Sequence, residues 1–190
     1  MISMFPDPKH RRIFHLHNFM GCRMDIFKYA REIELQSEQL YRDLATQSPI
    51  QEIASIFGFL AGEERRHCEL LRTMSRHAAF PSIEKSSILI DSKAAFKNLS
   101  EHFTAPGTIA VDREYALGAA LDFEKKSISL YEKALMELAP GSDDERSRPV
   151  LLQILEQEKN HARLVESLME FHRHPHEWLE NAEWNHLDEF

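Results

Sequence analysis

The chain has 190 residues and a formal net charge of −8, enough length for one sizeable hydrophobic core. The negative charge argues against nonspecific binding to nucleic acid or anionic membrane, because both need a basic protein surface. Its two cysteines, Cys22 and Cys68, are too few for a zinc ribbon, a rubredoxin-type centre or a disulfide framework. No apolar run reaches the length of a signal peptide core or a membrane span, so we expect a soluble cytoplasmic protein.

Four segments carry apolar residues at alternating spacings of three and four, the period of a helix that buries one face in a bundle. They run from Phe27 to Leu44, from Ile53 to Met74, from Leu117 to Leu138 and from Leu151 to Leu168. Short breaks, around Pro49 and over 139–149, separate the first segment from the second and the third from the fourth. We therefore expect each of these pairs to be antiparallel neighbours.

The segment from 75 to 108 is too long for a turn, and it matches a crossover that follows the bundle from one end to the other. A short helix is expected within it, over 92–103. The sequence therefore predicts an all-α, antiparallel four-helix bundle with a long crossover between its second and third helices.

One domain is expected over 1–190, with the bundle core at about 25–172 and a C-terminal tail over 173–190. The tail is predicted to hold a short helix after Pro175. His172, His174 and His176 surround that proline and could bind a surface metal, but an exposed linker interrupted by proline is the favoured interpretation.

Every predicted helix places a carboxylate where its stripe should be apolar. The second and fourth helices carry Glu-x-x-His, whose two polar residues share one helix face. The first and third carry a Glu followed seven residues later by a Tyr. The set consists of Glu34, Tyr41, Glu64 and His67 in the first half and of Glu124, Tyr131, Glu158 and His161 in the second. The halves thus match element by element, as in an internal repeat.

Nearby residues compete for these roles. Glu63 precedes Glu64, but the stripe selects Glu64, and Glu63 is expected to turn about 100° away. Cys68 is turned from His67 by the same angle and is expected to be a small buried apolar residue. A third Glu-x-x-His, Glu183 to His186, has no matching Glu–Tyr helix and is interpreted as incidental.

Four unpaired carboxylates in one core would cost several kcal/mol each, whereas two divalent cations would neutralise them. One Glu from each of two helices and Glu-x-x-His from each of two others is a known dinuclear arrangement. Oxygen and imidazole ligands suit iron or manganese, and zinc also fits. The simplest alternative is a solvated polar face on an ordinary bundle. The tyrosines are either hydroxyl donors that orient the Glu ligands or ordinary core tyrosines.

The stretches "AREIELQSEQLY", "LAGEERRHCELL", "ALDFEKKSISLY" and "ILEQEKNHARLV" resemble the rubrerythrin-like branch of the ferritin-like superfamily, over about 25–170. The resemblance implies a di-iron centre that reacts with peroxide or dioxygen, in a protein that forms a homodimer. It implies bridging roles for Glu64 and Glu158. The ligands that it implies are Glu34, Glu64, His67, Glu124, Glu158 and His161.

Two features depart from the family pattern. The chain has no rubredoxin module with paired Cys-x-x-Cys, so an external electron donor is expected. Rubrerythrins tend to carry a further Glu three residues after the third-helix ligand, where this chain has Ser127, so the set is closer to a six-ligand ferritin-like centre.

Three functions therefore stay open. They are reduction of peroxide or dioxygen, iron handling by ferroxidation with storage or delivery, and a structural or partner-binding bundle with a zinc-filled or vestigial site. Oxidation of an organic substrate also stays open, since the sequence reveals no access channel.

Overall fold

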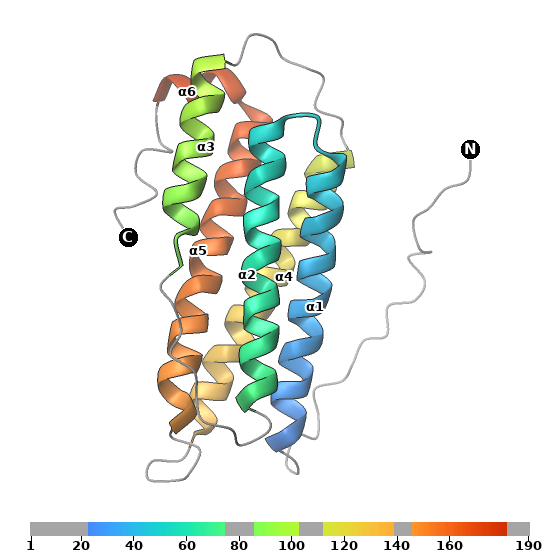
Figure 1. The fold of residues 1–190 in the computed structure, drawn as a ribbon, viewed down its shortest axis with the longest axis vertical. Helices are drawn as coiled ribbons and strands as arrows, with labels where there is room; N and C mark the ends of the chain where they lie inside the picture. The colour runs from blue at the N-terminus through green and yellow to red at the C-terminus, as the bar shows by residue number, and fades with distance from the viewer. Residues whose placement is uncertain (1–22, 75–85, 103–111, 139–145, 182–190) are drawn as a thin grey trace, which may run out of the picture.

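The computed structural model describes residues 23–74, 86–102, 112–138 and 146–181, and all regular structure in these ranges is helical. Four long helices lie side by side as a bundle (Figure 1). They are α1 (Arg23–Gln47), α2 (Gln51–Met74), α4 (Asp112–Glu137) and α5 (Arg148–Arg173). Helices α1 and α2 form one antiparallel hairpin, and α4 and α5 form a second (Figure 1). The predicted all-α antiparallel bundle is confirmed. Cys22 and the Glu183–His186 pair lie outside the described residues.

The predicted crossover is confirmed as well. Helix α2 ends at one end of the bundle and α4 begins at the other, and α3 (Ile88–His102) lies beside α2, along the half of the bundle nearer the start of α4 (Figure 1). This helix starts four residues before the predicted position. Its start is fixed locally, because the Ser86 hydroxyl accepts a hydrogen bond from the Ile88 N–H at 3.1 Å and the Ser87 hydroxyl donates to Asp91 at 2.6 Å.

The C-terminal tail holds the predicted short helix, α6 (Pro175–Asn181), with proline in its first turn, where no N–H partner is needed. The Trp178 ring packs against Phe96 of α3 and Phe171 of α5, at centroid distances of 4.7 and 5.4 Å. This contact fastens the tail to the bundle.

The interpretation of the histidine-rich segment as a linker is wrong. His172 belongs to α5 and His176 to α6, and His174 is the single residue between these helices. His174 and His176 are exposed as expected. The aromatic contacts of Trp178 supply the apolar burial that makes the segment helical rather than extended.

The apolar core is divided into two clusters, one on each side of a polar level in the middle of the bundle. One cluster includes Tyr41, Leu60 and Leu164, and the other includes Tyr131 and Ile154. The predicted stripes of α1, α2 and α5 are buried throughout. The polar level between the clusters contains the four carboxylates of those stripes and of α4.

Helix α4 differs from its predicted stripe. Leu121 and Ile128 are half-buried, whereas the buried positions are Ala120, Ser127 and Ala134. The core face is therefore shifted by one residue at these turns. Small residues give little hydrophobic signal, so a pattern of large apolar side chains places this face about 100° off at each shifted position.

Among the described helices, none combines the length and the hydropathy needed to cross a bilayer.

Replacing Trp178 with Ala should destabilise the protein by about 3–5 kcal/mol, because the buried indole leaves a cavity among Phe96 and Phe171. Urea unfolding followed by circular dichroism measures this. Glu180→Ala, at an exposed position of the same helix, is the control and should stay within about 0.5 kcal/mol of the parent. Equal stability of the two variants would show that α6 does not contribute to the core.

Candidate metal centre

The six predicted Glu and His residues converge at the polar level of the bundle. Each is at most 1% exposed. Their ligand atoms form two groups, and within each group all atoms lie within 4.8 Å of one another. The first group is Glu34, Glu64, His67 and Glu158, and the second is Glu64, Glu124, Glu158 and His161. Glu64 and Glu158 belong to both groups.

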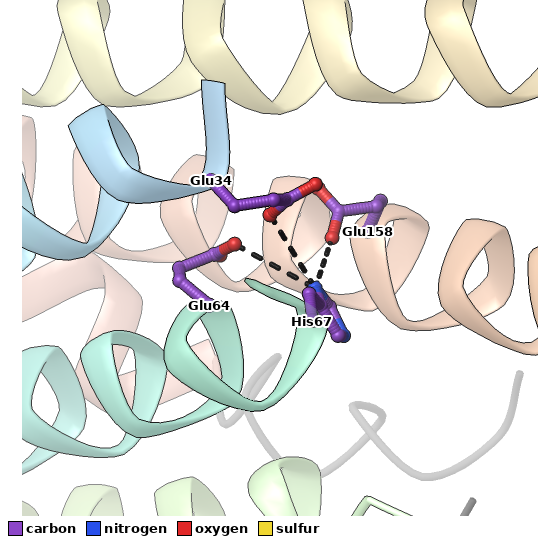
Figure 2. A group of neighbouring side chains, drawn as sticks. All are labelled: Glu34, Glu64, His67 and Glu158. Carbon is purple, nitrogen blue, oxygen red and sulfur yellow. Dashed lines mark ion pairs between the residues drawn. The ribbon is translucent and has the colours of Figure 1, made fainter. Parts of the chain in front are cut away.

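Both imidazoles point Nδ1 into this cluster. The Nδ1 of His67 lies 2.7 Å from Glu158, 3.5 Å from Glu34 and 3.6 Å from Glu64 (Figure 2). The Nδ1 of His161 lies 2.9 Å from Glu64 and 3.7 Å from Glu124. The two rings are nearly parallel, with centroids 5.5 Å apart. The cluster therefore has one imidazole for each group of ligand atoms.

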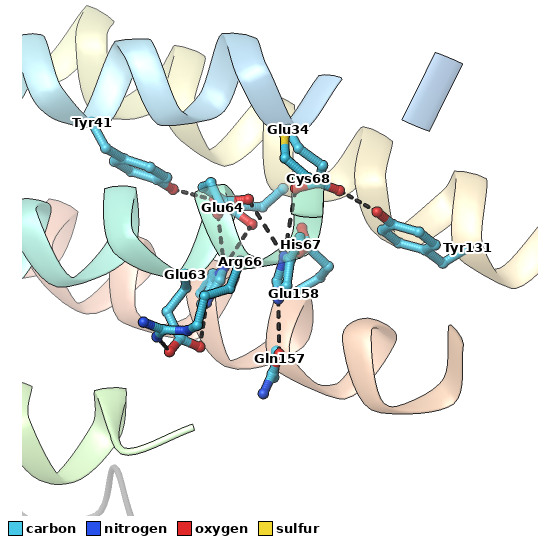
Figure 3. Close-up of polar contacts among 12 residues, drawn as sticks. Glu34, Tyr41, Glu63, Glu64, Arg66, His67, Cys68, Tyr131, Gln157 and Glu158 are labelled. Carbon is cyan, nitrogen blue, oxygen red and sulfur yellow. Dashed lines mark hydrogen bonds and ion pairs between the residues drawn. The ribbon is translucent and has the colours of Figure 1, made fainter. Parts of the chain in front are cut away.

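The two tyrosines lie at opposite ends of the cluster (Figure 3). The Tyr41 hydroxyl donates a hydrogen bond to Glu124 Oε1, and the Tyr131 hydroxyl donates to Glu34 Oε1. Each tyrosine thus bonds to the carboxylate of the other half of the repeat. Both tyrosines also contribute their rings to the apolar clusters, so they are core residues and donors to Glu at once.

The remaining inward-facing atoms have no hydrogen-bond partner outside the cluster within the described part of the chain. They are Oε2 of Glu34 and Glu124, both oxygens of Glu64 and Glu158, and Nδ1 of both histidines. Four buried carboxylates that have only one another and two imidazoles beside these atoms are costly to keep out of water. Anionic oxygens and imidazole nitrogens are donors for divalent transition metals. The residues present therefore fit a pair of such cations.

Electrostatics in the cluster show the same crowding of negative charge. Burial, followed by the neighbouring Glu124, raises the pKa of Glu64 to about 7. Burial and the charges of Glu34 and Glu64 raise the pKa of Glu158 well above its usual value. Burial by itself would lower the pKa of His161, but Glu64 and Glu124 outweigh it and raise that pKa to about 10.

The first half of the cluster follows the same logic. Burial opposes protonation of His67, yet the neighbouring Glu158 raises the pKa of this imidazole well above its usual value. Glu34 is the exception among the shifted carboxylates. Burial would raise its pKa, but close contacts with Glu64, His67 and Tyr131 hold that pKa below the usual value. Protons on the imidazoles thus replace part of the positive charge that cations would bring.

The family comparison agrees with this geometry. A family profile described as Rubrerythrin matches residues 25–169, well over half of the chain. The chain belongs to the rubrerythrin family. Its bundle with a long crossover is accordingly the ferritin-like fold, as the resemblance implied. Comparisons with curated proteins and with solved structures gave no match.

The structure of this rubrerythrin-family chain corrects one expectation about its site. Glu63 was expected to turn away from the core, but it is buried, it pairs with Arg66, and its Oε2 lies 3.5 Å from His161 Nε2. Helix α2 is covered by α1 on one side and by α3 on another, so more than one of its faces is buried. Aligning the two halves of the sequence places Glu63 and Gln157 at the same position, and this match was the available sequence signal for Glu63.

Cys68 is buried as predicted, with Sγ 3.6 Å from the Arg31 carbonyl oxygen. Burial, and next the charge of Glu34, raises the pKa of this thiol to about 12. The thiol is therefore neutral near pH 7, which agrees with its role as a small core residue. Ser37 is buried, as its place on the predicted stripe of the first helix required, and Ser127 is buried at the matching position, so each Glu of these two helices is followed three residues later by a buried serine.

Tyr41→Phe and Tyr131→Phe should each destabilise the metal-free protein by about 1–3 kcal/mol, because each leaves a buried Glu oxygen without its donor. Denaturant unfolding measures the loss. Tyr115→Phe is the matched control, since that side chain is 80% exposed and should change stability by less than about 0.5 kcal/mol. If all three variants unfold alike, the two buried hydroxyls contribute nothing.

The metal-free protein should lose stability as the pH rises from about 4.5 to about 10. The pKa of Glu64 rises from 4.5 to about 7 and that of His161 from 6.5 to about 10, so the native state holds protons that the unfolded chain has released. Stability therefore falls between pH 4.5 and 7 through Glu64, and between 6.5 and 10 through His161. Denaturation midpoints measured across this pH range check the prediction. The Glu64→Gln variant should show a weaker pH dependence of stability in the lower part of the range. A midpoint that rises with pH would contradict the prediction.

Proposed function

We propose that this protein is a non-haem di-iron oxidoreductase that reduces hydrogen peroxide or dioxygen. The observation that carries the proposal is the set of buried oxygen and nitrogen atoms that lie within 4.8 Å of one another in two groups and, among the described residues, have no hydrogen-bond partner outside the cluster. Membership of the rubrerythrin family supports iron as the metal. When bound, an iron pair supplies electrons and Lewis acidity to an oxidant.

The oxygen atoms that have no hydrogen bond suggest a role for each ligand. Glu64 and Glu158 belong to both groups, and the oxygens of each have no hydrogen-bond partner outside the cluster among the described residues, which would suit carboxylates shared by two cations. Glu34 and Glu124 each have one oxygen bound to a tyrosine and one without a hydrogen bond, which suits terminal ligands. His67 and His161 would each supply the imidazole ligand of one cation.

The tyrosines then keep the terminal carboxylates from rotating. A hydroxyl that donates to Oε1 leaves Oε2 available, so each of these carboxylates would already be held in position to bind a cation. Since neither Cys22 nor Cys68 belongs to a Cys-x-x-Cys pair, the electrons would come from an external donor.

Iron handling is the second candidate, and Ser127 favours it. This residue is buried beside the cluster at the position where the family tends to carry a further Glu. A six-ligand set of the ferritin type would oxidise ferrous iron and pass it on. The two candidates differ in turnover: a reductase consumes oxidant repeatedly with an added electron donor, whereas a ferroxidase consumes it in proportion to added iron.

Protein purified anaerobically without a histidine tag should contain about two irons per chain by plasma mass spectrometry, as two groups of ligands require. Glu64→Gln and Glu158→Gln should each lose most of this iron, because each removes an anionic ligand shared by both groups. Glu69→Gln, on an exposed part of α2, is the control and should keep it.

Stopped-flow mixing of the diferrous protein with peroxide and with dioxygen then identifies the oxidant. Repeated oxidant consumption with an added donor, lost in both ligand variants and kept in Glu69→Gln, is the result expected of a reductase. Iron content that is unchanged in both ligand variants would exclude the six-residue centre.

A further inference from the structure

The two halves of the internal repeat differ at one pair of matching positions whose side chains lie beside the two histidines. The residue before the core Glu is Glu63 in α2 and Gln157 in α5. His67 donates from its Nε2–H to Gln157 Oε1 at 2.8 Å, and His161 Nε2 lies 3.5 Å from Glu63 Oε2. Figure 3 shows Gln157 beyond the His67 imidazole, and Glu63 likewise on the side away from α1. One imidazole therefore faces an amide and the other a carboxylate.

Both outer residues are closed off from solvent. Glu63 is 2% exposed and Gln157 is 7% exposed. Within the described residues, neither Glu63 Oε2 nor His161 Nε2 has a hydrogen bond, and these two buried atoms face each other. The other oxygen of Glu63 accepts a hydrogen bond from Arg66. Oε2 is thus left for the imidazole.

Charge differs between the halves as well. The Arg66 side chain is 61% exposed, so its charge is solvated while the Glu63 carboxylate is buried. The position that matches Arg66 in α5 is Asn160, which has no charge and accepts a hydrogen bond from Arg163. The His161 side of the cluster therefore has a buried carboxylate where the His67 side has the neutral amide of Gln157.

An imidazole that binds a cation through Nδ1 carries its proton on Nε2, and the acceptor of that proton sets the strength of the ligand. A carboxylate accepts a stronger, charge-assisted hydrogen bond than an amide and makes the imidazole a better donor to the metal. Such outer partners typically change metal affinity by about 10–100-fold.

We propose that Glu63 and Gln157 are positioning residues that make the two metal positions unequal, with the position at His161 binding a divalent cation more tightly than the position at His67. The inference rests on the proposed dinuclear centre. The inference adds the order in which the two positions bind cations. The six ligands cannot give this order, because they are of the same kinds in both halves.

Anaerobic titration of the metal-free protein with Co²⁺, followed by visible absorption and by calorimetry, tests the inference. The parent protein should bind two ions in steps that differ by about 10–100-fold in affinity. Glu63→Gln should make the two affinities more alike by weakening Co²⁺ binding at the His161 position. Gln157→Glu should do so by strengthening Co²⁺ binding at the His67 position. The variant with both substitutions should again show two different affinities.

Single-site backgrounds assign the effect to one histidine. With His67 replaced by Ala, Glu63→Gln should weaken the remaining Co²⁺ site by about 10–100-fold. With His161 replaced by Ala, Glu63→Gln should leave Co²⁺ affinity unchanged. A general loss of structure would weaken both backgrounds alike and would overturn the inference, and thermal melting of each variant shows whether it is folded.

The outcomes separate this inference from the proposed function. Two Co²⁺ ions bound with equal affinity by the parent, or an unchanged ratio of steps in Glu63→Gln, would overturn the inference and leave the dinuclear centre standing. No bound Co²⁺ in the parent would overturn both. Unequal steps that respond as expected would support the inference, even if the iron-loaded protein failed to reduce peroxide or dioxygen.

Discussion

The arrangement of this protein depends on the burial of four carboxylates at one level of a helical bundle. Taking such groups out of water costs several kcal/mol each unless opposite charge accompanies them. The polar contacts of the imidazoles and tyrosines with these carboxylates offset part of this cost. The imidazoles hold protons beside the shared carboxylates, and the tyrosines donate to the terminal ones. Two divalent cations would satisfy the atoms that these contacts leave without partners.

The fold supplies the closed surroundings that such a cluster needs. Each long helix contributes one carboxylate, and an apolar cluster on each side of the polar level keeps the helices in contact. The crossover through α3 lets α4 begin at the end of the bundle opposite to the end of α2. On α4, the small residues Ala120, Ser127 and Ala134 are buried together with Glu124 and Tyr131. The site is therefore a property of the whole bundle rather than of one loop.

The sequence predicted most of this because ligand positions follow the same period as core positions. In α1, α2 and α5 the large apolar residues and the ligands share one face, so one pattern located both. In α4, Ala120 and Ser127 carried too little hydrophobic signal to place the face. Glu63 was misplaced because a single stripe assumes a single buried face. The packing of Trp178 on Phe96 was not predictable, since it joins residues from distant segments without a shared pattern.

The hydrogen bonds of the cluster link residues 83, 90 and 97 positions apart, and each joins the first hairpin to the second. Contacts of such separation close long loops, which form late compared with helices and hairpins. Neither hairpin contains both halves of any of these bonds. The cluster thus exists only in molecules whose hairpins have docked, and any ion that binds it adds to the free energy of docking and not to that of the helices. Such an ion would join the two hairpins to each other.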